Sequence, residues 1–511
     1  MMRAHIFLIP WLLAGGGGIA NDQSRSFYAE EAARLAAQSY APGFTPPTDY
    51  AKGLSYDALQ RIRVKGEHWI FNQPSSALKI EPRLAGSYNS KGIQLSVLKN
   101  GVAQPVPFKA EFLEFPKDVP NPGDEKLSGY SGFRVIGPAR TDGKSPEHFT
   151  FGGGTYFRCY PEGLHYGLSA RGLILHREGK EEFPLFERFT FEEPKAQSSS
   201  MVWHALMNSP SATGAFRFVS SPGDPYEIKV EAEIFLRAGL SWNDLEVGLA
   251  GFSSMYWFGP ASMDRSSDFR GRVHDSEALA VVTTSGERFW RVLGNPRQVR
   301  RSSLPVDRLR GFGLIQRERS FAAYQDENAR YESRTSAWVE PLAGLDSGRV
   351  HLLELPTRTE FEDNIAAYFV PETLPSSGQP IRVGYRILWC SDVPILDSKL
   401  APIVQTRAGR QPDKSGVILL AVDFSKAGLT GKEQPKIELP PGLEQKFAHL
   451  KPLPDGKTIR LYFGVLQKDP KENISAEIRA QLVNQDKPAS ETWVYPWSSV
   501  ANIVLQPIDP Q

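Results

Sequence analysis

Ala232-Glu233-Ile234-Phe235-Leu236 decides the fold class, because apolar side chains recur at every second position of this stretch. Residues 93–97 and 350–355 repeat the pattern. A period of two is typical of a strand with one buried face. The chain also spreads 44 glycines and 40 prolines over its 511 residues, which indicates frequent turns between short strands. We therefore expect an all-β chain.

Helical patterns are few, and a chain of this length is expected to form more than one domain. Residues 27–37, with Ser26 as the expected N-cap, and residues 54–62 predict short helices. A stretch rich in proline and charge between 392 and 413 predicts a boundary. We expect a large β domain over 21–395, a linker over 396–412 and a small sandwich over 413–511. The strand patterns near 416–424, 437–439, 458–463 and 478–483 favour an immunoglobulin-like sandwich for the last part.

The first twenty residues have the features of a signal peptide. Arg3 and His5 precede the apolar run 6–14, and Gly18-Ile19-Ala20 offers a cleavage site. The alternative is an uncleaved anchor, but the apolar run is shorter than the roughly 20 residues that a membrane helix needs. We expect export to the periplasm. There, Cys159 and Cys390 either form a bridge or remain two buried thiols.

Composition narrows the classes of ligand. A net charge of +1 argues against a nucleic-acid partner, which needs clustered positive charge. An uncharged ligand such as a sugar fits this balance. The chain has no P-loop, no serine-hydrolase elbow and no histidine or cysteine spacing typical of zinc. We therefore expect neither a cofactor nor a metal.

Acids, aromatics and arginines gather in three segments, at 273–277, 321–341 and 356–365. Glycoside hydrolysis needs two carboxyl groups, and sugar rings pack on aromatic faces. Residues 357–360 have the form of a capping box. A helical turn there would place Glu360 and Asp363 on one face and raise the pKa of one of them. His274 is either a buried, hydrogen-bonded histidine or part of a site.

The same segments carry a resemblance to a known family. The chain resembles the periplasmic glucan biosynthesis proteins OpgG and OpgD, also called MdoG and MdoD, from about residue 27 to 389. The matching motifs are residues 166–173, 209–218, 273–276, 310–317, 324–326, 338–341 and 355–365. The resemblance implies a large galactose-mutarotase-like β-sandwich followed by a small immunoglobulin-like one. It also implies a role in osmoregulated periplasmic glucan synthesis and similarity to inverting endo-β-1,2-glucanases.

The resemblance also implies roles for particular residues. Asp363 would be the general acid, and Asp275 the base, acting on water through a proton relay. Tyr331 and Glu360 would share the same hydrogen-bonded site. For substrate binding we expect Tyr324, Arg334, Trp338 and His274. The chain departs from the family pattern at Thr190, at Thr335 and in the loop 342–348 around Leu345, and we expect the last change to affect linkage preference or rate.

Three functions remain open from the sequence. The first is an endoglucanase acting on a β-glucan. The second is a non-catalytic glucan-binding factor that assists synthesis or export. The third is a lyase or epimerase, because β-sandwiches host several sugar chemistries. The C-terminal domain either braces the larger one or contacts a partner such as a membrane glucan synthase, and the resemblance implies a homodimer.

Overall fold

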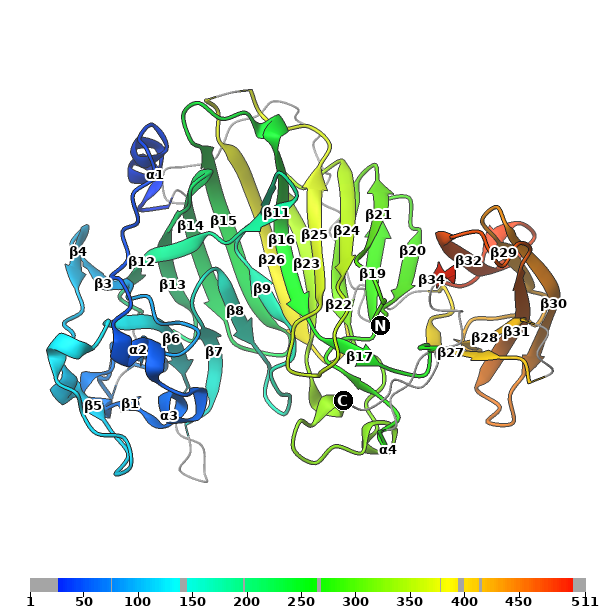
Figure 1. Cartoon of the computed structure of the whole chain (residues 1–511), viewed down its shortest axis with the longest axis horizontal. Helices are drawn as coiled ribbons and strands as arrows, with labels where there is room; N and C mark the ends of the chain where they lie inside the picture. The colour runs from blue at the N-terminus through cyan, green and yellow to red at the C-terminus, as the bar shows by residue number, and fades with distance from the viewer. Residues whose placement is uncertain are drawn as a thin grey trace, which may run out of the picture.

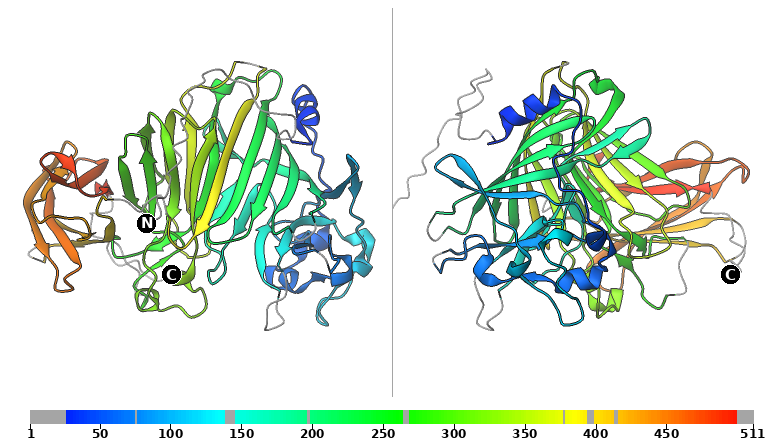
Figure 2. Two further views of the ribbon diagram at one scale, coloured as in Figure 1. Left: turned by 180° about the vertical axis from the view of Figure 1, so that it is seen from behind. Right: turned by 60° about the vertical axis from the view of Figure 1, so that its left-hand side comes forward.

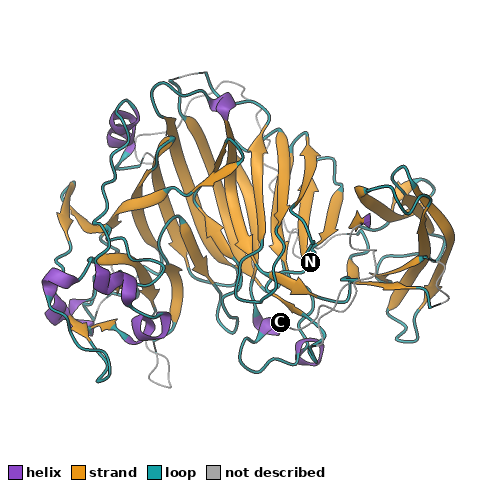
Figure 3. Cartoon of the chain, viewed as in Figure 1, coloured by secondary structure: helices purple, strands orange, loops and turns teal. Residues whose placement is uncertain are grey.

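Strands dominate the chain (Figure 3), so the prediction of an all-β fold is confirmed. The computed structural model describes residues 26–74, 76–137, 145–195, 198–263, 268–376, 378–393, 399–412 and 416–499. The predicted signal peptide, residues 1–20, lies outside the described residues. No helix in these ranges is both long and apolar enough to cross a membrane.

Two long sheets pack face to face to form a large sandwich (Figure 1). Within the described residues, the first sheet has the order β2-β6-β7-β8-β9-β16-β25-β24-β21, and β10 joins β11 to β16. Its strands are β2 (Lys79–Leu84), β6 (Tyr130–Ile136), β7 (Glu147–Phe151), β8 (Tyr156–Cys159), β9 (Ser169–Arg171), β10 (Ile174–Arg177), β11 (Lys180–Glu182), β16 (Leu245–Ser254), β21 (Arg300–Val306), β24 (Gly348–Glu354) and β25 (Ile365–Pro371).

The second sheet runs through both parts of the chain, in the order β29-β32-β34-β20-β19-β22-β23-β26-β15-β14-β13-β12-β3-β4. The strands that belong to the large sandwich are β3 (Gln94–Lys99), β4 (Val102–Pro105), β12 (Leu185–Glu192), β13 (Met201–Asn208), β14 (Ala212–Ser221), β15 (Tyr226–Leu236), β19 (Ala278–Thr283), β20 (Arg288–Val292), β22 (Leu309–Ile315), β23 (Ser336–Ala343) and β26 (Ile381–Cys390).

Aromatic side chains from both sheets fill the space between them. The ring of Phe133 on β6 lies 5.3 Å from that of Phe189 on β12 and 5.8 Å from that of Trp203 on β13. Full burial of such a ring stabilises the fold by about 1.5–3 kcal/mol. On β15, buried and partly exposed residues alternate from Tyr226 to Phe235, which is the period-two pattern predicted from residues 232–236.

A second, smaller sandwich follows and lies at one end of the large one in all views (Figures 1 and 2). Its first sheet has the order β27-β28-β31-β30, and its second sheet contains β29, β32, β33 and β34. These strands are β27 (Ile403–Arg410), β28 (Ile418–Ser425), β30 (Leu443–Pro452), β31 (Thr458–Gln467), β29 (Gln434–Glu438), β32 (Ser475–Asn484), β33 (Lys487–Pro488) and β34 (Thr492–Ser498).

The two sandwiches are joined through their sheets. Strand β34 pairs in parallel with β20, with Trp493 opposite Trp290. Arg317 donates to both carboxylate oxygens of Glu491, at 2.7 and 2.6 Å. The segment 396–412, expected to be a linker, contains strand β27. Its charged side chains concealed this strand in the sequence, because residues such as Arg407 and Arg410 lie on its less buried positions.

Short helices and strand pairs complete the fold. The helices are α1 (Ala29–Ala36), α2 (Asp49–Gly53), α3 (Tyr56–Arg61) and α4 (Phe321–Tyr324). The 3-10 helices are η2 (Gly66–His68), η3 (Ala110–Phe112), η4 (Asp124–Lys126), η5 (Trp242–Asp244) and η6 (Tyr331–Ser333), and the small strands are β1 (Arg63–Val64), β5 (Leu113–Glu114), β17 (Tyr256–Phe258) and β18 (Val273–His274). Ser26 does not cap α1, because the helix begins at Ala29 and Tyr28 occupies the N-cap position.

The two cysteines do not form a bridge. Cys159 on β8 and Cys390 at the end of β26 are both free and buried. Burial raises the pKa of the Cys390 thiol to about 12. The second of the two readings drawn from the sequence, two buried thiols, therefore describes these residues.

Candidate functional site

Three segments that are distant in sequence meet at one end of the large sandwich, near α4 and β17 at its lower edge in Figure 1. Asp275 directly follows β18, and Tyr331 lies in η6, which leads into β23. Glu360 and Asp363 lie in the loop between β24 and β25. The four residues expected to be catalytic therefore lie close together in one cluster.

A buried asparagine fixes the end of the loop that carries two of these acids. Asn364 donates to the carbonyl oxygens of Tyr256 and Leu355, both at 3.0 Å. Its own Oδ1 accepts from the N–H of Tyr256 (2.8 Å). Because these bonds tie the loop to the neighbouring strands, the backbone next to Asp363 is held in place.

Arg270 connects three carboxylates. It donates to Asp268 (2.6 Å), to Asp326 (2.5 Å) and to Glu360 (2.8 Å). The hydrogen bond to Asp268, followed by those to the other two acids, raises the pKa of the guanidinium. Sequence reasoning missed Arg270, although it lies only five residues before Asp275. The positive charge of Arg270 balances the negative charge of these acids, and its hydrogen bonds fix the orientation of the Glu360 carboxyl group.

Tyr331 and Glu360 form the central hydrogen bond of the cluster. The Tyr331 hydroxyl donates to Glu360 Oε2 at 2.7 Å, and the tyrosine is only 3% exposed. Burial, the bond to Glu360 and the charge of Asp275 together raise the pKa of Tyr331. The hydroxyl therefore keeps its proton and lies within the electrostatic reach of both acids.

Asp275 is 8% exposed. Its Oδ1 lies 3.5 Å from Arg334 Nε and has no hydrogen-bond partner among the described residues. Burial raises the pKa of Asp275; the charge of Arg334 opposes this rise and the charge of Asp363 adds to it. A carboxylate with a raised pKa is a stronger base than an exposed one while it remains ionised.

Asp363 is in a different environment. Its side chain is 35% exposed, and its Oδ2 lies 3.8 Å from Arg158 Nη2. Arg158 lies on β8, where its Nε donates to Ser169 Oγ (2.5 Å). Because Asp363 faces solvent, a large substrate can reach it. Asp275 is less accessible to such a substrate.

Three of the residues expected to bind substrate are buried instead. Trp338, Tyr324 and His274 are at most 1% exposed. We therefore correct the prediction that they contact a sugar directly, because a ring enclosed by protein has no free face for stacking. Trp338 belongs to the core shared with the second sandwich, whereas Tyr324 packs beside Tyr331, with ring centroids 6.3 Å apart.

His274 contacts the cluster indirectly, through Gln316. Its Nδ1 lies 2.9 Å from Gln316 Oε1, and the Gln316 amide donates to Tyr331 O. Since that amide NH₂ is the donor to Tyr331, Oε1 is an acceptor and His274 Nδ1 carries the proton. Burial and then the charge of Arg272 lower the pKa of His274 to about 3. A neutral histidine thus positions Tyr331 through Gln316, a residue that sequence reasoning missed.

Arg334 remains partly exposed and lies beside Asp275. It donates to Tyr166 O, and its guanidinium lies 5.3 Å from the centre of the Tyr331 ring. The next residue, Thr335, donates its N–H to His165 O (3.1 Å). This contact ties the loop around Tyr166 to the cluster, so the departure at Thr335 lies at the site.

The other two departures lie away from the site. Thr190 on β12 is buried, and its hydroxyl lies 2.6 Å from that of Tyr28. Leu345 lies in the turn between β23 and β24. That turn is one strand length, about 25 Å, from the end of β23 that meets the cluster. The prediction that the loop 342–348 affects specificity therefore has no direct structural basis.

Residues 355–363 form a loop, and the predicted capping box is wrong. Thr357 N–H donates to Asn295 Oδ1 (3.0 Å), so it is not available to Glu360. Glu360 turns toward Arg270 and Tyr331, whereas Asp363 faces Arg158. The two acids therefore do not share the face of a helical turn.

Two phenylalanines beside the cluster are unusually exposed. Phe269, next to Arg270, is 82% exposed, and Phe361, next to Glu360, is 89% exposed. Each is the direct chain neighbour of a residue of the hydrogen-bonded pair Arg270 and Glu360. Aromatic faces of this kind suit the apolar faces of sugar rings. The sequence alone did not distinguish these rings from buried ones.

Comparisons with known proteins agree with the resemblance found in the sequence. The family described as "Periplasmic glucan biosynthesis protein, MdoG" matches residues 24–497. Glucans biosynthesis protein G of Rhodopseudomonas palustris (strain BisA53) is 37% identical over 472 residues, covering 91% of this chain and 92% of the relative. The protein of the same name from Sodalis glossinidius is 34% identical over 488 residues, with 91% of both chains covered. The chain therefore belongs to the MdoG family of periplasmic glucan biosynthesis proteins.

Proposed function

We propose that this chain is a periplasmic, inverting endo-β-1,2-glucanase that hydrolyses the glucan backbone during osmoregulated glucan biosynthesis. The observation that carries the proposal is the difference between two neighbouring carboxyl groups. Asp275 is buried beside Arg334, whereas Asp363 is exposed beside Arg158. Inverting hydrolysis needs such a pair, one acid at the glycosidic oxygen and one base serving the attacking water. The family name supports a glucan as the ligand.

Asp363 acts as the general acid. Its exposed side chain gives its proton to the glycosidic oxygen as the bond to the anomeric carbon breaks. The carboxylate that remains is stabilised by Arg158, 3.8 Å away. The leaving chain therefore departs as a neutral alcohol.

Asp275 acts as the base, through a relay. Water attacks the anomeric carbon on the face opposite the leaving oxygen, and its proton passes to Asp275 through Tyr331 or a second water. The Tyr331 hydroxyl is a suitable carrier because its oxygen can accept one proton while it gives up another. Glu360, held by Arg270, orients that hydroxyl in the resting state.

The glucan chain is held by exposed groups beside the acids. Phe269 and Phe361 offer faces for sugar rings, and Arg334 offers donors for hydroxyl groups. These groups take the place of Trp338, Tyr324 and His274, whose burial leaves them a supporting role.

Incubation of the purified protein with linear β-1,2-glucan tests the proposal. Reducing ends and product lengths are followed for the wild type, for Asp363→Asn and for Asp346→Asn. Asp346 lies in the distant β23–β24 turn, so it is a matched control for the same chemical change. We expect short glucans from the wild type and from Asp346→Asn, and none from Asp363→Asn.

A different outcome would favour a non-catalytic role. If none of the three proteins releases reducing ends while all of them bind the glucan, the chain is a glucan-binding factor. If Asp363→Asn keeps the wild-type rate, the assignment of the general acid fails.

A further inference from the structure

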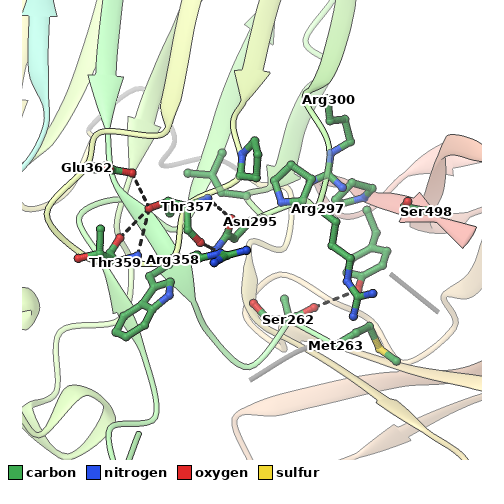
Figure 4. A pocket seen from close by; sticks show the side chains of 18 residues that line it. Ser262, Met263, Asn295, Arg297, Arg300, Thr357, Arg358, Thr359, Glu362 and Ser498 are labelled. Carbon is green, nitrogen blue, oxygen red and sulfur yellow. Dashed lines mark hydrogen bonds between the residues drawn. The ribbon is translucent and has the colours of Figure 1, made fainter. Parts of the chain in front are cut away.

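A cavity of about 770 Å³ lies between the two sandwiches, next to the loop that carries Glu360 and Asp363 (Figure 4). Residues 261–263, 293–297 and 356–359 line it from the large sandwich, and Tyr495, Pro496 and Ser498 of β34 line it from the small one. The four proposed catalytic residues do not line it. A volume of this size is typical of small-molecule sites.

The charged side chains around this interface cavity are mainly basic. Arg297, Arg300 and Arg358 line it, with Glu362 as the acidic lining residue. Glu362 already accepts a hydrogen bond from the Thr357 hydroxyl at 3.2 Å. Arginine is the side chain best shaped to bind phosphate or carboxylate, since its planar fork donates two parallel hydrogen bonds. The cavity therefore favours a ligand that carries negative charge.

Arg300 belongs to this wall but is turned toward a buried glutamate. Its Nε donates to the buried Glu354 (2.6 Å), whereas its Nη2 is buried without a hydrogen-bond partner among the described residues. Because this atom is closed to solvent, a ligand in the cavity would instead meet Arg358, which is exposed, and Arg297, which is partly exposed.

Other lining groups suit a sugar. Trp257 is partly exposed and offers an aromatic face. In Figure 4, Thr357, Arg358 and Thr359 lie on one side of the cavity and Ser498 on the other. The hydroxyl groups of Thr359 and Ser498 can both donate and accept, as sugar hydroxyls require. The lining therefore combines anion recognition with carbohydrate recognition.

We propose that the interface cavity is a second ligand site, which binds an anionic saccharide, a sugar that bears a phosphate or carboxylate group. The site also touches the loop of the carboxylate cluster. Asn295 on its wall exchanges two hydrogen bonds with the backbone of Thr357, at 2.8 and 3.0 Å. A ligand in the cavity thus contacts the same loop as the glucan, from a separate pocket.

Isothermal titration calorimetry with small sugars tests this site without any need for hydrolysis. The probes are glucose 6-phosphate, glucuronate, glucose and inorganic phosphate, at low salt. We expect at least one charged sugar to bind with a Kd of about 1 mM or tighter. Glucose and inorganic phosphate should each bind about tenfold more weakly, because each lacks one half of the recognition. Comparison of the two charged sugars distinguishes a phosphate site from a carboxylate site.

Variants place the binding in this cavity. Arg358→Ala removes an exposed arginine from the wall and should weaken binding about tenfold. Ser498→Trp fills the cavity from β34 and should abolish binding. Arg310→Ala, an exposed arginine at the far end of β22, is the matched control and should bind like the wild type. The proposal would be overturned if neither charged sugar binds, if plain glucose binds equally well, or if both cavity variants bind like the wild type.

Discussion

Replacement of Tyr331 by phenylalanine separates the relay from the fold. The substitution removes a buried hydroxyl that donates to Glu360 at 2.7 Å and keeps the ring. A hydrogen bond to a charged group contributes about 1.5–3 kcal/mol. Glu360 retains the two bonds from Arg270, at 2.8 and 3.3 Å. We therefore expect the stability loss to lie at the lower end of that range, about 1.5 kcal/mol.

The effect on catalysis should be far larger. Proton transfer by a positioned group contributes about 10²–10⁴-fold in rate, so kcat should fall at least about 100-fold. KM should change little, since the ring and its contact with Arg334 remain. Initial rates of reducing-end release against glucan concentration give both constants, and urea denaturation gives the stability.

Tyr368→Phe is the matched control. Its hydroxyl also donates to a glutamate, Glu246, at 2.6 Å, but the pair lies on the β25 and β16 strands, outside the cluster. It should lose similar stability and keep its kcat. The relay is refuted if Tyr331→Phe retains the wild-type kcat, or if both variants lose activity in proportion to their stability.

Three further changes probe the site and its support. Asp275→Asn should abolish activity. The pKa of Asp275 is raised in the folded protein, so the folded wild type binds more protons than the unfolded chain and loses stability as pH rises above about 4; the variant should therefore gain stability relative to the wild type over this pH range. Thermal midpoints of both proteins at several pH values measure this, and a difference that does not change with pH would contradict it. Phe361→Ala should raise KM for glucan and leave the melting temperature nearly unchanged, since an 89% exposed ring contributes little to folding; an unchanged KM argues against stacking. Arg291 is fully buried and donates to Glu354 at 2.9 Å and to Glu477 at 2.8 Å. Glu354→Ala should destabilise the protein by about 3–5 kcal/mol in urea, because it removes one of these two partners from a buried charge. A loss below about 1 kcal/mol would show that Glu477 alone suffices.

Local patterns predicted the strands better than their partners. Alternation along 232–236 correctly indicated β15, because the buried face of a strand appears in its own sequence as apolar residues at every second position. Nothing local, however, could indicate that residues 289–291 pair with 492–494, since that contact joins segments about two hundred positions apart. Strand β27 was missed for a different reason, because the polar side chains at its less buried positions are typical of a linker.

The site was predicted at the level of segments rather than contacts. The motifs around Asp275, Tyr331 and Asp363 lie in one cluster, as the resemblance implies. The role of Arg270 depends on the convergence of three loops, so the sequence could not indicate it. Trp338 was wrongly predicted to bind substrate. The sequence does not show whether an aromatic residue on a strand faces a ligand or the core, and Trp338 faces the core.

The anomeric form of the first product tests the central claim most directly. Proton NMR during hydrolysis of linear β-1,2-glucan distinguishes α from β reducing ends before they equilibrate. Inverting attack with Asp363 as the acid and Asp275 as the relayed base predicts that α ends appear first, and that they are absent with Asp363→Asn. Early β ends, or α ends that persist in Asp363→Asn, would contradict the account.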